Sequence, residues 1–261
     1  MGWLSSTIAL YRSALLETGR STRRTILAVP VLVAAFIAIQ LVAGLVAPLG
    51  LVGGFIVGFM HAGAVGWYLS LIEVGVTGRR KVKLEDIRAS IGLYFWEVIS
   101  VGFIFWIGQM VIQGLTSAAV LAAAVLLASI IFNPAPELIY QGRTRGLDLL
   151  GDAMRFMQNN WPEWLGAHLG AAAVMTGWLW LSTGAIDIGG GTELVRMFGP
   201  FFGFLGASGV AFALISAGAI GAISAVAFLL FTHAFMLFRG HLYRELSTSS
   251  RRSRQWRARM G

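Results

Sequence analysis

The sequence predicts an all-α integral membrane protein with six transmembrane helices, and three observations lead to this fold class. Hydrophobic residues make up 57% of the 261 residues and charged residues only 12%, too few to coat a soluble globule. The mean hydropathy is +0.75, and apolar runs of about 20 residues, the length that crosses the hydrocarbon core, recur along the chain. Of the 20 lysines and arginines, all but Arg196 fall in segments assigned to one side of the membrane, which the positive-inside rule identifies as the cytoplasm.

The chain is expected to divide into three parts. Residues 1–25 place apolar side chains at three- and four-residue steps, as an amphipathic helix on the cytoplasmic surface does. Residues 26–240 form the six-span membrane domain. Residues 241–261 form a basic cytoplasmic tail, expected to be disordered or to lie on anionic lipid headgroups. These parts predict a multi-pass protein of the plasma (inner) membrane with both termini in the cytoplasm, and they give little reason to expect a nucleic-acid partner.

The spans are predicted at residues 26–47, 51–75, 93–114, 116–134, 165–185 and 214–238. Basic segments at 76–92 and 141–164 connect spans on the cytoplasmic side. The outer connection at roughly 186–213 is predicted to be a loop with a short interfacial helix, with a lid or a re-entrant segment as alternatives. Its three consecutive glycines are not followed by the Lys-Ser/Thr pair of a phosphate loop.

Similar text at the inner ends of spans 2, 4 and 6 suggests three copies of one helical hairpin. Each of these ends has two apolar residues, two others and then a glycine, which is Gly75, Gly142 or Gly240. Segments with helical apolar spacing precede the odd spans, at 3–15, 84–96 and 147–164. The suggested unit is therefore surface helix, span, span and glycine exit, although any helical hairpins with inner glycines would look alike.

Span 2 carries the clearest packing pattern, a small residue at every fourth position. Small residues let helix backbones approach closely, and this drives helix association in lipid. The small-residue stripe comprises Gly50, Gly54, Gly58, Ala62, Gly66 and Ser70. Because a four-residue step lags the helical period, the stripe winds around span 2 and predicts a central helix that meets two neighbours.

Four residues form a candidate intramembrane polar site: His61, Asn133, Glu137 and His233. His61 is placed near the bilayer centre, where an ionisable side chain suggests a proton relay or a metal or haem ligand. His233 is placed nearer the inner end of span 6, so its depth does not match that of His61. The alternative for His61 is a neutral side chain bonded to a neighbouring helix. No metal ligand, cofactor or catalytic residue is assigned.

A helix break is predicted at Asn133-Pro134-Ala135-Pro136-Glu137, because each proline removes a backbone donor and collides with the preceding turn. Asn133 is expected to cap the restarted helix, and Gly142 to end it in a left-handed conformation. We expect the break at the inner membrane surface, with Glu137 solvated or paired with a loop arginine, so that Glu137→Gln would cost about 0–1 kcal/mol. The alternative is a broken helix inside the protein that lines a ligand site, as in transporters.

Chemistry beyond the membrane anchor has little support in the sequence. Four glutamates, Glu73, Glu97, Glu137 and Glu163, are expected near the inner boundary, in interfacial ion pairs or in a cation vestibule. Recognisable hydrolase, zinc-protease and nucleotide motifs are absent, and the lack of cysteine excludes disulfides and thiol catalysis. The sequence therefore favours a non-enzymatic scaffold or membrane subunit for partner proteins. A transporter or transporter subunit for a small solute, ion or lipid is the alternative, and an intramembrane or lipid-modifying enzyme is a third class.

Overall fold

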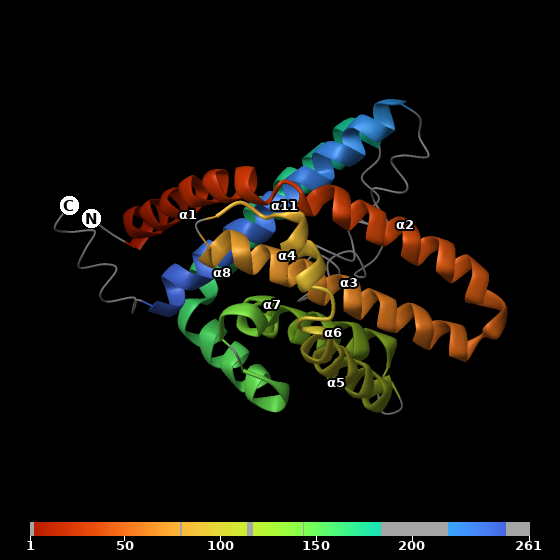
Figure 1. The fold of residues 1–261 in the computed structure, drawn as a ribbon. Helices are drawn as coiled ribbons and strands as arrows, with labels where there is room; N and C mark the ends of the chain where they lie inside the picture. The colour runs from red at the N-terminus through yellow and green to blue at the C-terminus, as the bar shows by residue number, and fades with distance from the viewer. Residues whose placement is uncertain (1–2, 79, 114–116, 143, 184–218, 249–261) are drawn as a thin grey trace.

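The computed structural model describes residues 3–78, 80–113, 117–142, 144–183 and 219–248 (Figure 1). Over these ranges the chain is almost entirely helical and has no strand, as the sequence predicts. The helices are α1 (Trp3–Thr25), α2 (Ala28–Val46), α3 (Leu51–Thr77), α4 (Leu84–Ala89), α5 (Phe95–Gln113), α6 (Ala118–Ile131), α7 (Ala135–Glu137), α8 (Gly146–Thr183) and α11 (Ala219–Thr248), with a 3₁₀ turn η1 (Ala47–Leu49) and a π-helical turn η2 (Leu138–Gly142). The predicted outer connection at 186–213 and the tail after Thr248 lie outside the described residues.

Five of the described helical segments are long and apolar enough to cross a membrane, which indicates a membrane-embedded protein. They are Ala28–Leu49, Leu51–Thr77, Phe95–Ile112, Ala119–Gly142 and Ile223–Thr248. The remaining predicted span, 165–185, corresponds to the second half of α8, which is not among the five. His168 and several glycines interrupt the apolar residues there and lower the hydropathy. Six spans therefore stay a prediction.

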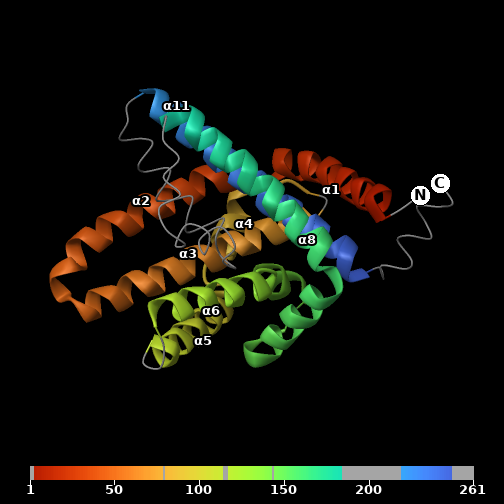
Figure 2. The same cartoon turned by 180° about the vertical axis from the view of Figure 1, so that it is seen from behind.

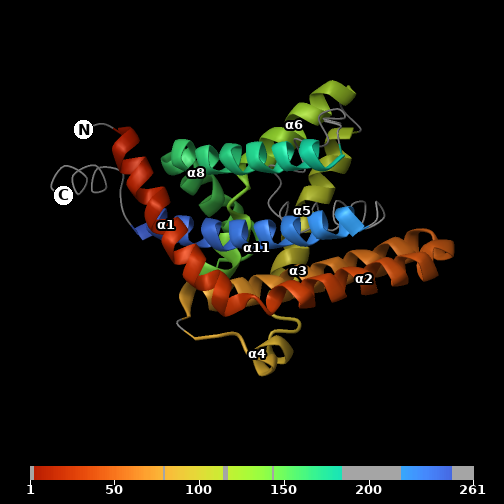
Figure 3. The same cartoon turned by 90° about the horizontal axis from the view of Figure 1, so that it is seen from above.

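The long helices form three contacting pairs: α2 with α3, α5 with α6, and α8 with α11. Figure 3 shows the α2–α3 pair extending away from the rest of the molecule, with the α5–α6 pair pointing in a different direction. The α2–α3 connection is tight, since a Cβ added to Gly53 would lie 2.2 Å from the carbonyl oxygen of Val46. The pairs agree with the predicted hairpins, while the sequence repeat itself stays a prediction.

Helix α8 combines a predicted surface segment with a predicted span in one element of 38 residues. Pro162 lies inside this helix, and Figure 2 shows that α8 changes direction partway along its length. A proline inside a helix removes one backbone hydrogen bond and kinks the axis. The first half therefore diverges from the bundle, while the second half runs along α11.

Helix α11 packs against more than one part of the fold. It contacts α1, α2, α3, α7 and α8, and α1 crosses it close to one end of the bundle (Figure 3). Leu237 and Leu242 of α11 are fully buried in the main apolar core. Helix α11 therefore brings its side chains into contact with the N-terminal helix, the α2–α3 pair, α7 and α8.

The small-residue stripe of α3 is divided between two environments. The first half, Gly50, Gly54 and Gly58, is exposed, and the second half, Ala62, Gly66 and Ser70, is buried. At Gly66 an added Cβ would lie 2.7 Å from the carbonyl oxygen of Leu93, whereas at Gly58 it would meet nothing within 4 Å. Of Gly58 and Gly66, only Gly66 therefore lies against the backbone of another segment.

Candidate functional site: a buried polar centre beside the helix break

The predicted helix break is present between α6 and α7. Helix α6 ends at Ile131, and Pro134 occupies the N-cap of the three-residue α7, which carries Pro136 in its first turn. The chain then continues as the π-helical turn η2. Two prolines this close together remove two backbone donors, so the i to i−4 ladder of α6 cannot continue through them. Isolated π-helical turns are frequent at functional sites.

Two details of the break differ from the sequence prediction. No side chain caps α7, because the Asn133 side chain accepts a hydrogen bond of 2.8 Å from the indole Nε1 of Trp164 instead. Gly142 does not have a positive φ, and the left-handed residue is Gly146, with φ 58°, at the start of α8. The hydrogen bond from Trp164 thus takes the place of a side-chain cap at the start of α7, and the left-handed residue comes four positions later than predicted.

A buried ion pair forms the middle of the site. The Nη2 atom of Arg239 on α11 donates to Oε2 of Glu137 at 2.8 Å and to the backbone carbonyl oxygen of Asn133, also at 2.8 Å. The side chain of Glu137 is 0% exposed and that of Arg239 is 1% exposed. The carbonyl freed by the helix break is therefore used by the same guanidinium that neutralises the carboxylate. We call Asn133, Glu137, Trp164 and Arg239 the polar centre.

Trp164 joins the two sides of the polar centre. Its indole donates to Asn133, and the Arg239 guanidinium carbon lies 5.5 Å from the centre of the Trp164 ring. Arginine over an indole face is a favourable cation–π arrangement, most of all where water is excluded. Phe156 and Tyr243 pack around the same ring. Residues of α8 and α11 and the break after α6 are thus fixed to one another at one place.

The expected surface position of Glu137 is wrong. Asn133 and Glu137 are both fully buried, and the arginine that pairs with Glu137 is itself inside the protein. Arg239 lies one residue beyond the last predicted span, 214–238, but α11 continues to Thr248 with Leu242 and Leu246 buried. A break inside the protein, the alternative considered for this stretch, is what the structure shows.

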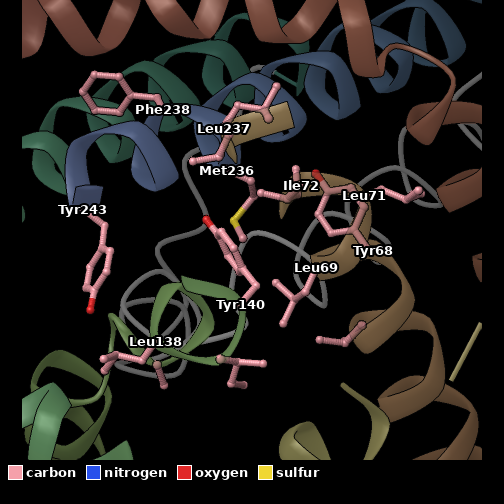
Figure 4. Close-up of a cluster of buried hydrophobic side chains, with 14 of the residues drawn as sticks. Tyr68, Leu69, Leu71, Ile72, Leu138, Tyr140, Met236, Leu237, Phe238 and Tyr243 are labelled. Atoms are coloured by element: carbon pink, nitrogen blue, oxygen red, sulfur yellow. The ribbon is translucent and has the colours of Figure 1, made fainter. Parts of the chain in front are cut away.

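The polar centre leaves hydrogen-bonding capacity that protein side chains do not use. The buried side-chain atoms that make no hydrogen bond within the described part of the chain include Oε1 of Glu137, Nε of Arg239, the hydroxyl of Tyr140 and Nε2 of His168. Leaving such a group unpaired costs about 1–3 kcal/mol. Figure 4 shows Tyr140 pointing between α3 and α11, towards Met236 and Ile72. The site therefore has the donors and acceptors that a proton, a water molecule or a small polar solute would need.

His233 belongs to a separate buried network on the same helix. Its Nε2 lies 2.8 Å from the Thr25 hydroxyl and its Nδ1 lies 3.0 Å from the Tyr68 hydroxyl. With both ring nitrogens hydrogen-bonded, His233 joins α11 to α1 and α3. Its arrangement is that of a packed, satisfied histidine rather than a ligand held for a metal.

His61 lies apart from the other three predicted residues. Its Nδ1 is 2.9 Å from the backbone oxygen of Val57 on its own helix, and it lines an apolar groove of about 640 Å³ between α3 and α5. Gly58 and Trp106 line the same groove. Of the four predicted polar residues, the structure brings together Asn133 and Glu137 and leaves His61 elsewhere.

Arg239, Trp164, Tyr140 and His168 are site residues that sequence reasoning did not select. One signal was available for Arg239, because apolar residues at helical spacing follow it, as they do in a helix that remains packed. The contact between Trp164 and Asn133 spans 31 positions. Contacts between residues so far apart cannot be read from one sequence.

The other predicted carboxylates have partners of their own. Tyr94 donates to Glu73 at 2.7 Å, and Glu97 pairs with the exposed Arg145 at 3.0 Å. The interfacial ion pair is therefore seen for Glu97. Within the described ranges, no three histidine, aspartate or glutamate side chains gather in a way that could hold a metal ion. In comparisons with protein-family models, curated proteins and solved structures, nothing matches this chain.

Proposed function

We propose that the chain is a multi-pass protein of the plasma (inner) membrane, with both termini in the cytoplasm, that acts as a non-enzymatic scaffold or membrane subunit for partner proteins. The observation that supports this best is the pairing within the polar centre. Glu137 and Arg239 neutralise each other and are 0% and 1% exposed. A buried pair that neutralises its own charges acts as a joint between elements, so the parts that remain available to partners are the outer helix faces.

Helix α1 carries the outer face that suits this role. Leu10 and Ala14 are buried against the protein, whereas Leu4, Ile8 and Leu15 are 66%, 66% and 59% exposed. An amphipathic helix with a second apolar face has something further to bury, either in the headgroup region or against a partner. The scaffold role requires that at least part of this face contacts a partner protein.

Photo-crosslinking in native membranes tests the proposal. A photoreactive amino acid at Ile8 should give adducts with another protein, whereas the same group at Ile37 should give lipid adducts. Ile37 is a matched control because it is 56% exposed and belongs to the apolar α2. If both positions gave lipid adducts alone, the face of α1 would be a membrane anchor and the scaffold role would lose its support.

Transport of a small solute, ion or lipid is the second candidate, and the unused buried atoms of the polar centre favour it. A carboxylate beside a broken helix within a candidate span is the arrangement that transporters use for ions. Proteoliposomes containing a pH-sensitive dye would report proton flux. Transport through this site requires flux that Glu137→Gln abolishes and that Asp152→Asn, in an exposed pair with Arg155, retains. Equal fluxes in both variants, or none in the unaltered protein, would exclude proton transport through Glu137.

A further inference from the structure

A polar cleft of about 420 Å³ lies at the junction of α1, the end of α3 and α11. Three arginines line it, Arg20, Arg24 and Arg244, together with one carboxylate, Glu17. The charge of these four side chains is 3 − 1 = +2. Glu17 is already bonded to Arg20 at 2.6 Å. The cleft is therefore electropositive and distinct from the polar centre described above.

Arg24 and Arg244 reach into this region from opposite helices. The Nη1 atom of Arg244 donates to the carbonyl oxygen of Val76 at 2.7 Å, and that of Arg24 approaches the carbonyl oxygen of Gly78 at 3.5 Å. Both carbonyls belong to the C-terminal end of α3. Each guanidinium has five N–H donors, and these contacts each involve one nitrogen. Each side chain is thus oriented by α3 and keeps donors for an anion, which arginine binds in a bidentate manner.

His241 adds a buried imidazole whose donor and acceptor nitrogens can be assigned from its contacts. It lines the cleft and is 3% exposed. The Ser21 hydroxyl donates its proton to the carbonyl oxygen of Gly75 at 2.8 Å and lies 2.9 Å from Nε2 of His241. Because the hydroxyl proton is already used, Nε2 must be the donor, and in the neutral ring Nδ1 is then an acceptor. Nδ1 is buried and makes no hydrogen bond to the residues that the structure describes.

The cleft thus offers guanidinium donors for anionic oxygens, with one imidazole acceptor buried in its wall. We propose that it binds a phosphate group accompanied by a hydroxyl, supplied either by the headgroup of an anionic phospholipid such as phosphatidylglycerol, whose hydroxyls are on the glycerol, or by free hydrogen phosphate. Both sources combine acceptor oxygens with a hydroxyl donor. The site is independent of the scaffold role, since it uses none of the exposed apolar residues of α1.

Ligand-induced thermal stabilisation of the purified full chain in detergent tests the proposal at constant ionic strength. The probes are short-chain phosphatidylglycerol, short-chain phosphatidylcholine as the zwitterionic control, and inorganic phosphate against chloride. We expect phosphatidylglycerol to bind at least about tenfold more tightly than phosphatidylcholine, because the choline cation offsets the phosphate charge in an electropositive cleft and supplies no hydroxyl donor. Stabilisation by phosphate as well would identify the free anion as sufficient, and stabilisation by the lipid alone would identify the headgroup.

The variants separate the cleft from general charge effects. Arg24→Gln with Arg244→Gln should weaken binding by about tenfold or more. The control, Arg23→Gln with Arg155→Gln, removes the same charge from exposed positions that do not line the cleft. It should change binding by less than about twofold. If the double variant does not fold, the single variant Arg24→Glu tests the proposal. The hydrogen bond from the Arg24 side chain to the Gly78 carbonyl oxygen is long, at 3.5 Å, so replacing Arg24 removes little from the fold. Equal affinity for the two lipids with no phosphate effect, or equal losses in both double variants, would overturn the proposal.

Discussion

Removing the charge of Glu137 should destabilise the protein far more than removing the charge of a surface carboxylate. In Glu137→Gln the Arg239 guanidinium remains in place, 1% exposed, without the anion that neutralises it. An uncompensated buried charge costs about 3–5 kcal/mol. The exposed pair of Arg155 and Asp152, with side-chain exposures of 72% and 29%, is the matched control, and Asp152→Asn should cost about 0–1 kcal/mol.

The double substitution Glu137→Leu with Arg239→Met separates the effect of pairing from that of charge. It removes both charges, so the desolvation cost of each disappears together with their attraction. Replacement of a buried pair by apolar groups of similar volume is often neutral or stabilising by about 1–4 kcal/mol. Arg239→Met alone should be as harmful as Glu137→Gln, since it leaves the carboxylate buried and removes the donor to the Asn133 carbonyl.

The assay is reversible unfolding in mixed detergent micelles, followed by tryptophan fluorescence, with the free energy of unfolding extrapolated to native conditions. The chain has nine tryptophans, and Trp164, which packs against Arg239, contributes the part of the emission change that comes from the polar centre. A Glu137→Gln variant that lost no more stability than Asp152→Asn would refute the reasoning, because Glu137 would then be solvated in the membrane-embedded protein.

Three further predictions test the packing and the topology. Gly66→Leu should lower the free energy of unfolding by about 1–3 kcal/mol or more, because an added Cβ meets backbone at 2.7 Å, while Gly58→Leu, with open space around it, should change it by less than about 0.5 kcal/mol. Similar losses at both positions in a thermal melt would contradict the divided stripe. Gly240→Ala should be destabilising because its Cβ would lie 2.5 Å from both the Tyr140 hydroxyl and Cγ2 of Val76. Tyr140→Phe in the same chain should restore part of the loss, and no recovery in chemical unfolding would mean that the contact with Val76 causes it. A fluorescent cytoplasmic reporter fused to the C-terminus should be active, since six spans return the chain to its starting side, whereas activity of a periplasmic reporter there would indicate an odd number of spans.

Local chemistry explains what the sequence by itself determined. Membrane embedding follows from the apolar content, and the helical character from the length and composition of each run. The break before Pro134 and Pro136 could be predicted because proline prevents the helix from continuing whatever surrounds it. The curvature of α8 at Pro162 has the same local cause.

Tertiary structure alone decided which of these features lie inside. Glu137 and Arg239 are 102 positions apart, and neither residue carries information about the other. Their burial depends on α11 remaining packed beyond Arg239, where Leu242 and Leu246 are in the core. Likewise, the spacing of small residues in α3 is the same at Gly58 and Gly66, but only Gly66 meets a neighbouring backbone. The periodicity of a sequence shows which residues share one face of a helix. Which part of that face is buried depends on the neighbouring helix that packs against it, and the sequence of the first helix does not specify that neighbour.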